Sequence, residues 1–251
     1  MGKSDSAAGS FYAGLDGVTI QSKGSRLLGG LYRAAGQGPR PTALLLHGLP
    51  GVEKNLDIAY ALRDAGWNCL YFHYRGSWGS QGVFSLAGRH DDLLAATTWL
   101  REQPCVDANR LALIGHSAGG YLALMAGAMD MDFQAIVALC PLVAPVRAPL
   151  SLEIFNEFAL MVHGVSGEEL RSQWEALPAL ESNAGRLRDR SLLMLTGRQD
   201  DIFPPQHYLP LLAAVPTIEW HEFANGDHCL SLCRQEAVRR ILTWLALPRK
   251  Q

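Results

Sequence analysis

The chain has 251 residues, of which 48% are hydrophobic and 18% charged, and its formal net charge at pH 7 is −2. An average globular protein carries about 25% charged residues, so this composition indicates a densely packed domain rather than disorder. Without a Lys/Arg block that could neutralise phosphates we expect no nucleic-acid partner. No apolar run approaches the roughly 18 residues of a membrane span, so we expect no membrane partner.

The first ten residues contain no apolar core of the kind a signal peptide needs. The five cysteines are an odd number without a framework spacing, which favours reduced, buried thiols over disulfides. We therefore expect a soluble, cytoplasmic protein. A homo-oligomer is left open by the sequence.

Short apolar runs alternate with longer helix-like stretches, a pattern typical of β-α-β crossovers that build a mostly parallel sheet. Strands are expected near Val18–Ile20, Leu28–Tyr32, Ala43–His47, Cys69–Tyr74, Leu111–Gly115, Ile136–Cys140, Leu192–Thr196 and Ile218–Phe223. The first two lie so close together that we expect an edge hairpin. Helices are expected near Leu56–Ala65, Asp91–Arg101, Ala118–Met129, Pro205–Ala214 and Cys233–Leu245.

One stretch breaks this alternation, because residues 145–180 are too long for a simple crossover. They predict two helices, the first at Ser151–His163 and the second opened by Ser166, with Glu169 at the spacing of a capping box. We therefore expect residues 145–180 to form a small helical cap. The core domain would then consist of residues 1–144 and 181–251.

The segment Gly115-His116-Ser117-Ala118-Gly119 matches the pattern G-x-S-x-G. In this pattern the serine occupies a strained turn between a strand and a helix, and only small neighbours let the backbone fold so tightly. An expected strand precedes the segment and an expected helix follows it. This context predicts that Ser117 is a nucleophile.

A serine hydroxyl is a poor nucleophile at neutral pH, so it needs a base within reach and a third group that holds the base. Asp200 and Asp201 follow one expected strand, and His228 follows the last one. The chain order is thus Ser, Asp, His. We expect activity to fall at acid pH as the base becomes protonated.

Acyl transfer also needs two preset N–H donors for the oxyanion. We expect one at Ala118, where a helix begins and its dipole favours negative charge. The glycine loop after the third strand would supply the other, and Leu49 N–H is the candidate.

From this His-Gly loop through Gly115–Gly119 to His228, the chain resembles the α/β-hydrolase superfamily, in its branch of small esterases and prolyl-oligopeptidase-like serine hydrolases. The resemblance implies an eight-stranded, mostly parallel sheet flanked by helices, and ester or amide hydrolysis through an acyl-enzyme. The segment Gly197-x-x-Asp200-x-x-Phe203-Pro204 resembles the family's acid loop, and its spacing selects Asp200 over Asp201. His73 stands where such proteins often carry an acid, which puts a local hydrogen bond in doubt.

The sequence favours no metal or cofactor, since H-E-x-x-H, a second cysteine pair and a P-loop are all missing. We expect a carboxylesterase acting on a small-molecule ester, with Trp78, Phe155, Phe158 and Trp174 as candidate substrate contacts. A small peptidase or a thioesterase of the same fold stays open, because the triad fixes acyl transfer but not the leaving group. A noncatalytic ligand-binding protein of this fold is the alternative from another class.

Overall fold

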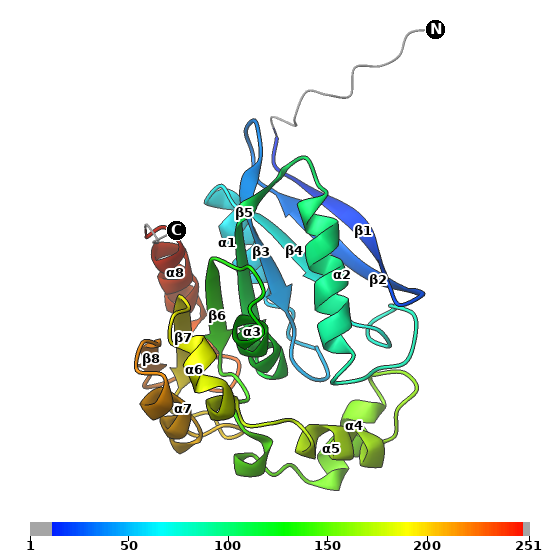
Figure 1. Cartoon of the computed structure of the whole chain (residues 1–251), viewed down its shortest axis with the longest axis vertical. Helices are drawn as coiled ribbons and strands as arrows, with labels where there is room; N and C mark the ends of the chain where they lie inside the picture. Colours follow the sequence, from blue (N-terminus) through cyan, green and yellow to red (C-terminus); the bar gives the residue numbers. More distant parts are fainter. Residues whose placement is uncertain (1–11, 248–251) are drawn as a thin grey trace, which may run out of the picture.

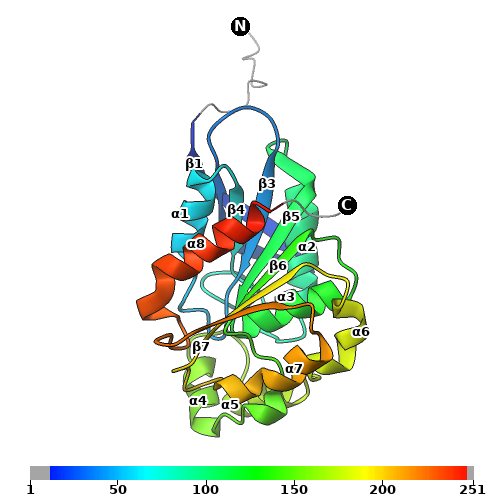
Figure 2. The same cartoon turned by 90° about the vertical axis from the view of Figure 1, so that its left-hand side faces the viewer.

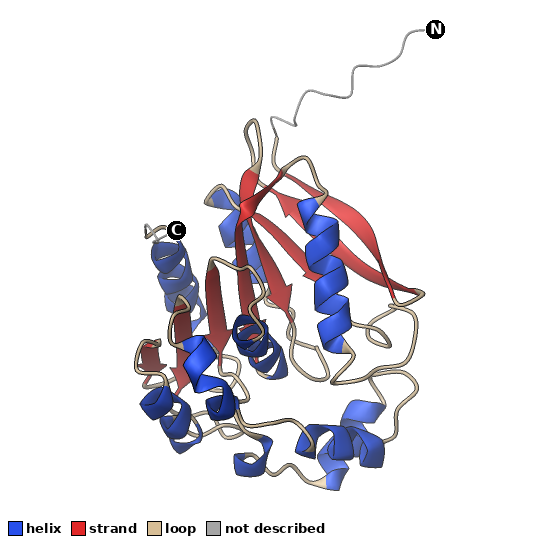
Figure 3. Cartoon of the chain, in the orientation of Figure 1, coloured by secondary structure: helices blue, strands red, loops and turns tan. Residues whose placement is uncertain are grey.

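The computed structural model describes residues 12–247, which form one eight-stranded sheet with the order β1-β2-β4-β3-β5-β6-β7-β8 (Figures 1 and 3). The strands are β1 Gly14–Ser22, β2 Ser25–Arg33, β3 Arg40–Leu46, β4 Asn68–Phe72, β5 Val106–His116, β6 Ala135–Leu139, β7 Leu192–Gly197 and β8 Glu219–Phe223. Strand β2 runs antiparallel to β1 and β4, whereas β4, β3 and the strands from β5 to β8 pair in parallel. The predicted mostly parallel sheet of about eight strands is confirmed.

The expected edge hairpin is also present. Strands β1 and β2 pair along their whole length, from Gly14 opposite Arg33 to Ser22 opposite Ser25. The turn between them contains Lys23 and Gly24 at φ 46° and 79°. Such a two-residue turn with positive φ matches the right-handed twist of the paired strands.

Helices cover both faces of the sheet (Figure 2). They are α1 Leu56–Asp64, α2 Arg89–Arg101, α3 Ala118–Ala128, α4 Leu152–Ala159, α5 Gly167–Glu175, α6 Ala184–Leu187, α7 Leu209–Ala214 and α8 Arg234–Leu245. Because successive side chains of a strand point to opposite faces, Leu44 and Leu46 of β3 pack with α2 and α3, whereas Leu45 packs with α1 and α8. The central strands therefore contain continuous apolar runs, such as Ala43–Leu46 of β3 and Leu111–Ile114 of β5, as expected for a sheet buried on both sides.

The inserted residues 145–180 lie between β6 and β7, and their helices α4 and α5 lie beyond the carboxyl ends of the strands (Figure 1). The predicted capping box is present, since Ser166 Oγ accepts from Glu169 N and Ser166 N donates to the Glu169 carboxylate. The predicted extent of the first cap helix was wrong, because α4 ends at Ala159 instead of His163. Beyond it, His163 N donates to Gly76 O at 2.7 Å, so this segment is bonded to the core chain and leaves the helix.

The last predicted features concern one helix, the cysteines and membrane-spanning segments. The helix expected at Pro205–Ala214 is divided into a 3-10 turn, Pro205–His207, and α7, which has Pro210 in its first turn. All five cysteines are free. No helix within residues 12–247 has the length and apolar character needed to cross a membrane. The first ten residues, which motivated the expected location, lie outside the described residues.

Candidate active site

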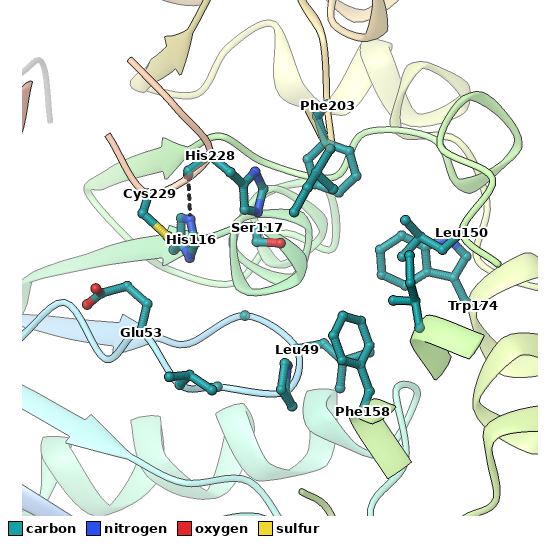
Figure 4. Close-up of a pocket in the computed structure, with 16 residues that line it drawn as sticks. Leu49, Glu53, His116, Ser117, Leu150, Phe158, Trp174, Phe203, His228 and Cys229 are labelled. Atoms are coloured by element: carbon teal, nitrogen blue, oxygen red, sulfur yellow. Dashed lines mark hydrogen bonds between the residues drawn. The ribbon is translucent and has the colours of Figure 1, made fainter. Parts of the chain in front are cut away.

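A cavity of about 390 Å³ lies beneath the cap, where the carboxyl ends of the parallel strands meet (Figure 4). Ser117, at the end of β5, and His228, in the loop after β8, both line it. Clefts at the carboxyl ends of an open α/β sheet are the usual place for a ligand in such folds. This cavity is therefore the candidate active site.

The backbone of Ser117 is strained, with φ 55° and ψ −121°. The turn is held by Ser117 N donating to Leu139 O at 2.9 Å and by Leu142 N donating to Ser117 O at 3.1 Å. It also requires glycine at Gly119, where an added Cβ would lie 2.1 Å from the carbonyl oxygen of Leu46. The structure thus provides the tight strand-to-helix turn that the sequence pattern predicts.

Asp200 and His228 form a buried hydrogen-bonded pair, with 2.8 Å between Asp200 Oδ2 and His228 Nδ1. The other carboxylate oxygen accepts from Ile202 N at 2.9 Å and Phe203 N at 2.8 Å, which orients the acid. A carboxylate only accepts, so Nδ1 carries a proton, and in the neutral imidazole Nε2 then has a free lone pair. Figure 4 shows the His228 ring beside Ser117. Asp201, by contrast, is exposed.

The two proposed oxyanion donors belong to two segments that adjoin Ser117, the start of α3 and the loop after β3. Ala118 is the first residue of α3, and the N–H groups of a first helical turn have no partner within the helix. Leu49 lines the cavity from the loop after β3. That loop contacts the nucleophile, since a Cβ added at Gly48 would lie 3.0 Å from Ser117 Cβ.

Only two of the four predicted substrate contacts reach this cavity. Phe158 and Trp174 line it. Phe155 instead lies buried behind them, with its ring centroid 6.3 Å from that of Phe158 and 5.9 Å from that of Trp174. Trp78 lies outside the wall, where Trp78 Nε1 donates to Pro50 O and Lys54 Nζ lies 4.9 Å from the ring centroid.

Sequence reasoning missed several lining residues that come from loops. Phe203, in the acid loop, lies edge-to-face against His228 with centroids 5.1 Å apart and stacks on Trp174 at 6.4 Å. Glu53 and Cys229 line the opposite part of the cavity. The sequence positions of Glu53 and Cys229 could have indicated that they line the cavity, because Glu53 follows the proposed oxyanion loop and Cys229 directly follows His228.

His116 precedes the nucleophile and supports the loop that carries His228. His116 Nε2 lies 2.9 Å from the carbonyl oxygen of His228, so this nitrogen donates and the tautomer is fixed. Burial, with a further contribution from the neighbouring His228, lowers the pKa of His116 to about 4. At neutral pH His116 is therefore uncharged and adds no positive charge to the site.

Cys140, Asp200 and His228 place their potential ligand atoms within 4.8 Å of one another. Burial raises the pKa of the Cys140 thiol well above its ordinary value, whereas a metal ligand would have to be a thiolate. Asp200 already receives three hydrogen bonds, from Ile202 N, Phe203 N and His228 Nδ1. The chemistry of this group fits an acid–histidine pair better than a metal site.

Comparisons with known proteins agree with this fold. The model of the prolyl oligopeptidase family matches residues 56–247. The thiohydrolase apmlB of Arthrinium phaeospermum is 31% identical over 145 residues, which cover 53% of this chain and 41% of that protein. The first curated relatives are matched over only 36% to 45% of their own length.

Solved structures match nearly the whole chain. The α/β hydrolase GrgF from Penicillium sp. sh18 superposes with a TM-score of 0.76 at 20% identity, covering 92% of this chain and 98% of that one. Est1E from Butyrivibrio proteoclasticus gives a TM-score of 0.73 at 18% identity, covering 92% and 99%. At this level of identity the likeness concerns the fold, and the predicted α/β-hydrolase fold is confirmed.

Buried histidines should make the stability of the protein sensitive to acid. Burial lowers the pKa of His47 to about 3 and those of His116 and His207 to about 4. In the unfolded chain histidine titrates near 6.5, so below that pH the unfolded state binds more protons and the free energy of unfolding falls until about pH 4. At about 1.4 kcal/mol per pKa unit, each histidine should contribute on the order of 3 kcal/mol to this loss.

Urea unfolding between pH 7 and pH 4 measures this effect. His207→Gln keeps an acceptor for Val143 N, which now donates to His207 Nε2 at 2.9 Å, but it cannot be protonated. We expect this variant to lose less stability than the parent over the same pH interval. Parallel pH profiles for the two proteins would contradict the assignment.

Proposed function

The chain belongs to the prolyl oligopeptidase family of α/β hydrolases, and from this premise we propose that it is a serine hydrolase cleaving small to medium carboxylic esters through an acyl-enzyme. The observation that carries the proposal is the strained Ser117 in the same cavity as a histidine held by a buried carboxylate. A noncatalytic binding protein would have no need for this combination.

In the first half-reaction, His228 Nε2 takes the proton of Ser117 as Oγ attacks the ester carbonyl carbon. The Asp200 carboxylate holds Nδ1–H at 2.8 Å, which keeps the tautomer correct and stabilises the imidazolium that forms. The oxyanion of the tetrahedral intermediate is stabilised by Leu49 N–H and Ala118 N–H. Losing one such donor typically costs about 3 kcal/mol of barrier.

The intermediate collapses when the C–O bond to the alcohol breaks and His228 Nε2 returns its proton to the leaving oxygen. Water then attacks the acyl-enzyme, His228 again takes a proton, and Ser117 Oγ leaves with it as the carboxylic acid is released. Every proton is carried by His228, and the reaction needs no metal or cofactor.

The wall of the cavity supports an apolar acyl group. Leu150, Ile154, Phe158 and Trp174 of the cap line it together with Phe203. Each methylene buried there contributes roughly 0.8 kcal/mol, whereas a charged peptide end left unpaired would cost several. A thioester is the second candidate substrate, because it is cleaved by the same steps and one relative is a thiohydrolase.

Ser117 should be the acylated residue. A fluorophosphonate probe is expected to label the protein on Ser117, and Ser117→Ala should remove labelling together with ester hydrolysis, because no oxygen is left to attack. Peptide mass spectrometry locates the label. Modification of another serine, or full activity in Ser117→Ala, would overturn the proposal.

Asp200 and Asp201 are adjacent, so matched Asn variants test which carboxylate orients His228. Asp200→Asn should lower kcat by about 10³-fold or more while leaving the fold intact, because an amide no longer enforces the Nδ1–H tautomer. Asp201→Asn, at the exposed neighbouring position, should keep most of the activity. The circular-dichroism spectrum checks folding, and a larger loss from Asp201→Asn would reverse the assignment.

Substrate class is tested with p-nitrophenyl esters of rising acyl length beside p-nitrophenyl thioesters and aminoacyl anilides. We expect kcat/KM to rise with each methylene that fits the cavity of about 390 Å³ and then to decline. Anilides should be the poorest substrates. If they are preferred, the peptidase alternative replaces the ester proposal.

A further inference from the structure

The candidate active-site cavity has two chemically different ends, with Ser117 between them (Figure 4). One end is closed by apolar cap residues, including Phe158 and Trp174. Glu53 lies at the other end, below His116 and Cys229 (Figure 4). Among the described residues that line the cavity, Glu53 is the only Asp, Glu, Lys or Arg, so it favours a positive charge on the ligand.

Glu53 has binding capacity to spare. Its Oε1 accepts from Asn55 N at 2.6 Å, which uses one oxygen to support a residue at φ 55°. Within residues 12–247, Oε2 has no hydrogen-bond partner and Glu53 makes no ion pair. Half-buried and unneutralised, this charge is available to a ligand.

The nearby cations are committed elsewhere. Lys54 lies over the ring of Trp78, with Nζ 4.9 Å from the centroid. Arg234 Nε donates to Asp57 Oδ2 at 2.9 Å, and its Nη1 donates to Asn55 Oδ1 at 3.0 Å. Of the described charged residues that line the groove beside Glu53, Arg234 is paired with Asp57, so the Glu53 carboxylate is left without an ion-pair partner there.

Space for a ligand continues past Glu53. Glu53 and Cys229 also line a neighbouring groove of about 440 Å³, whose other walls are Leu56, Asp57, Ser231 and Arg234. The groove is polar, whereas the cap end of the cavity is apolar. A substrate that spans both would have an apolar half and a polar half, joined at Ser117.

The protonation step indicates which end of the cavity receives the acyl half of the ester and which end receives the alcohol half. His228 must protonate the leaving oxygen, so the leaving group departs along the side of the cavity formed by His228 and its neighbour Cys229. That side leads to Glu53 and the groove, because Cys229 lines both cavities. The acyl half then remains under the cap.

We propose that Glu53 selects esters whose alcohol half carries a positive charge, such as esters of amino alcohols, while the cap end receives an apolar acyl group. The inference rests on the proposed ester hydrolysis and adds the class of the leaving group. A cation beside the carboxylate gains an ion pair of moderate strength, worth about a 5-fold preference at a half-exposed site.

The test compares butyrylcholine with 3,3-dimethylbutyl butyrate, the neutral isostere in which carbon replaces the ammonium nitrogen. The parent should favour the choline ester in kcat/KM, mainly through KM, and Glu53→Gln should lower the ratio of the two kcat/KM values by about 5-fold. Gln keeps an oxygen for Asn55 N, so the loop bond is retained while the charge is removed. Glu157→Gln removes the same charge from an exposed cap position outside the cavity wall and should leave the ratio unchanged.

Binding of butyrylcholine to an inactive variant tests the role of Glu53 without turnover. Butyrylcholine is titrated calorimetrically into Ser117→Ala, and into the double variant that also carries Glu53→Gln. We expect about 5-fold weaker binding to the double variant. Equal binding, or an unchanged kcat/KM ratio in Glu53→Gln, would overturn the role of Glu53 and leave the proposed ester hydrolysis standing. Ester turnover that survives Ser117→Ala would instead overturn the proposed function, while the calorimetric comparison still decides the role of Glu53.

Discussion

Ser117 has a positive φ of 55°, a conformation that costs a non-glycine residue of order 1–3 kcal/mol and persists only where its surroundings enforce it. Here the enforcement comes from the close approach of α3 to the sheet. Added Cβ atoms at Gly115 and Gly119 would lie 2.2 Å from Gly119 O and 2.1 Å from Leu46 O. The same approach brings the loop after β3 against the nucleophile, and Arg89, buried beneath the turn, donates to Ala118 O at 3.0 Å. One tight turn therefore sets the position of the nucleophile and of both proposed oxyanion donors.

The acid and the histidine are positioned by a second close approach, between the loops after β7 and β8. An added Cβ at Gly197 would lie 2.2 Å from Gly226 O, and Gln199 N donates to Gly226 O at 2.8 Å. Because these bonds join the two loops directly, the 2.8 Å contact between Asp200 and His228 is held by backbone rather than by the side chains alone. His116 Nε2 then connects the His228 loop to the elbow at 2.9 Å. The three parts of the proposed triad thus belong to one bonded unit.

Local signals in the sequence were sufficient for the sheet, the elbow and the two loops, because each depends on residues close together in the chain. The capping box of Ser166 and Glu169 is a local signal of the same kind. Cavity walls depend on packing between distant segments. The sequence therefore predicted two wall residues that lie elsewhere and missed residues that do line the wall. Phe155 was expected at the wall as an apolar cap residue, and Trp78 because it lies close in sequence to proposed site segments. Phe155 is buried behind the wall, and Trp78 Nε1 donates to Pro50 O. Glu53 was missed because its position after the proposed oxyanion loop does not by itself show that this loop places Glu53 at the end of the cavity near His116 and Cys229 (Figure 4).

The cap contributes to selectivity as a wall that is attached to the core at several points. His163 N donates to Gly76 O, and Phe84 N donates to His163 O at 2.9 Å. Leu86 N donates to Gln173 Oε1 at 2.8 Å. Opening the cap would break these bonds, whereas the polar groove beside Glu53 adjoins the cavity without passing beneath α4 or α5. In the proposed mechanism the alcohol leaves before water attacks. In that mechanism a leaving group on the groove side would be exchanged for water without breaking the hydrogen bonds that attach the cap, while the acyl group stays under it.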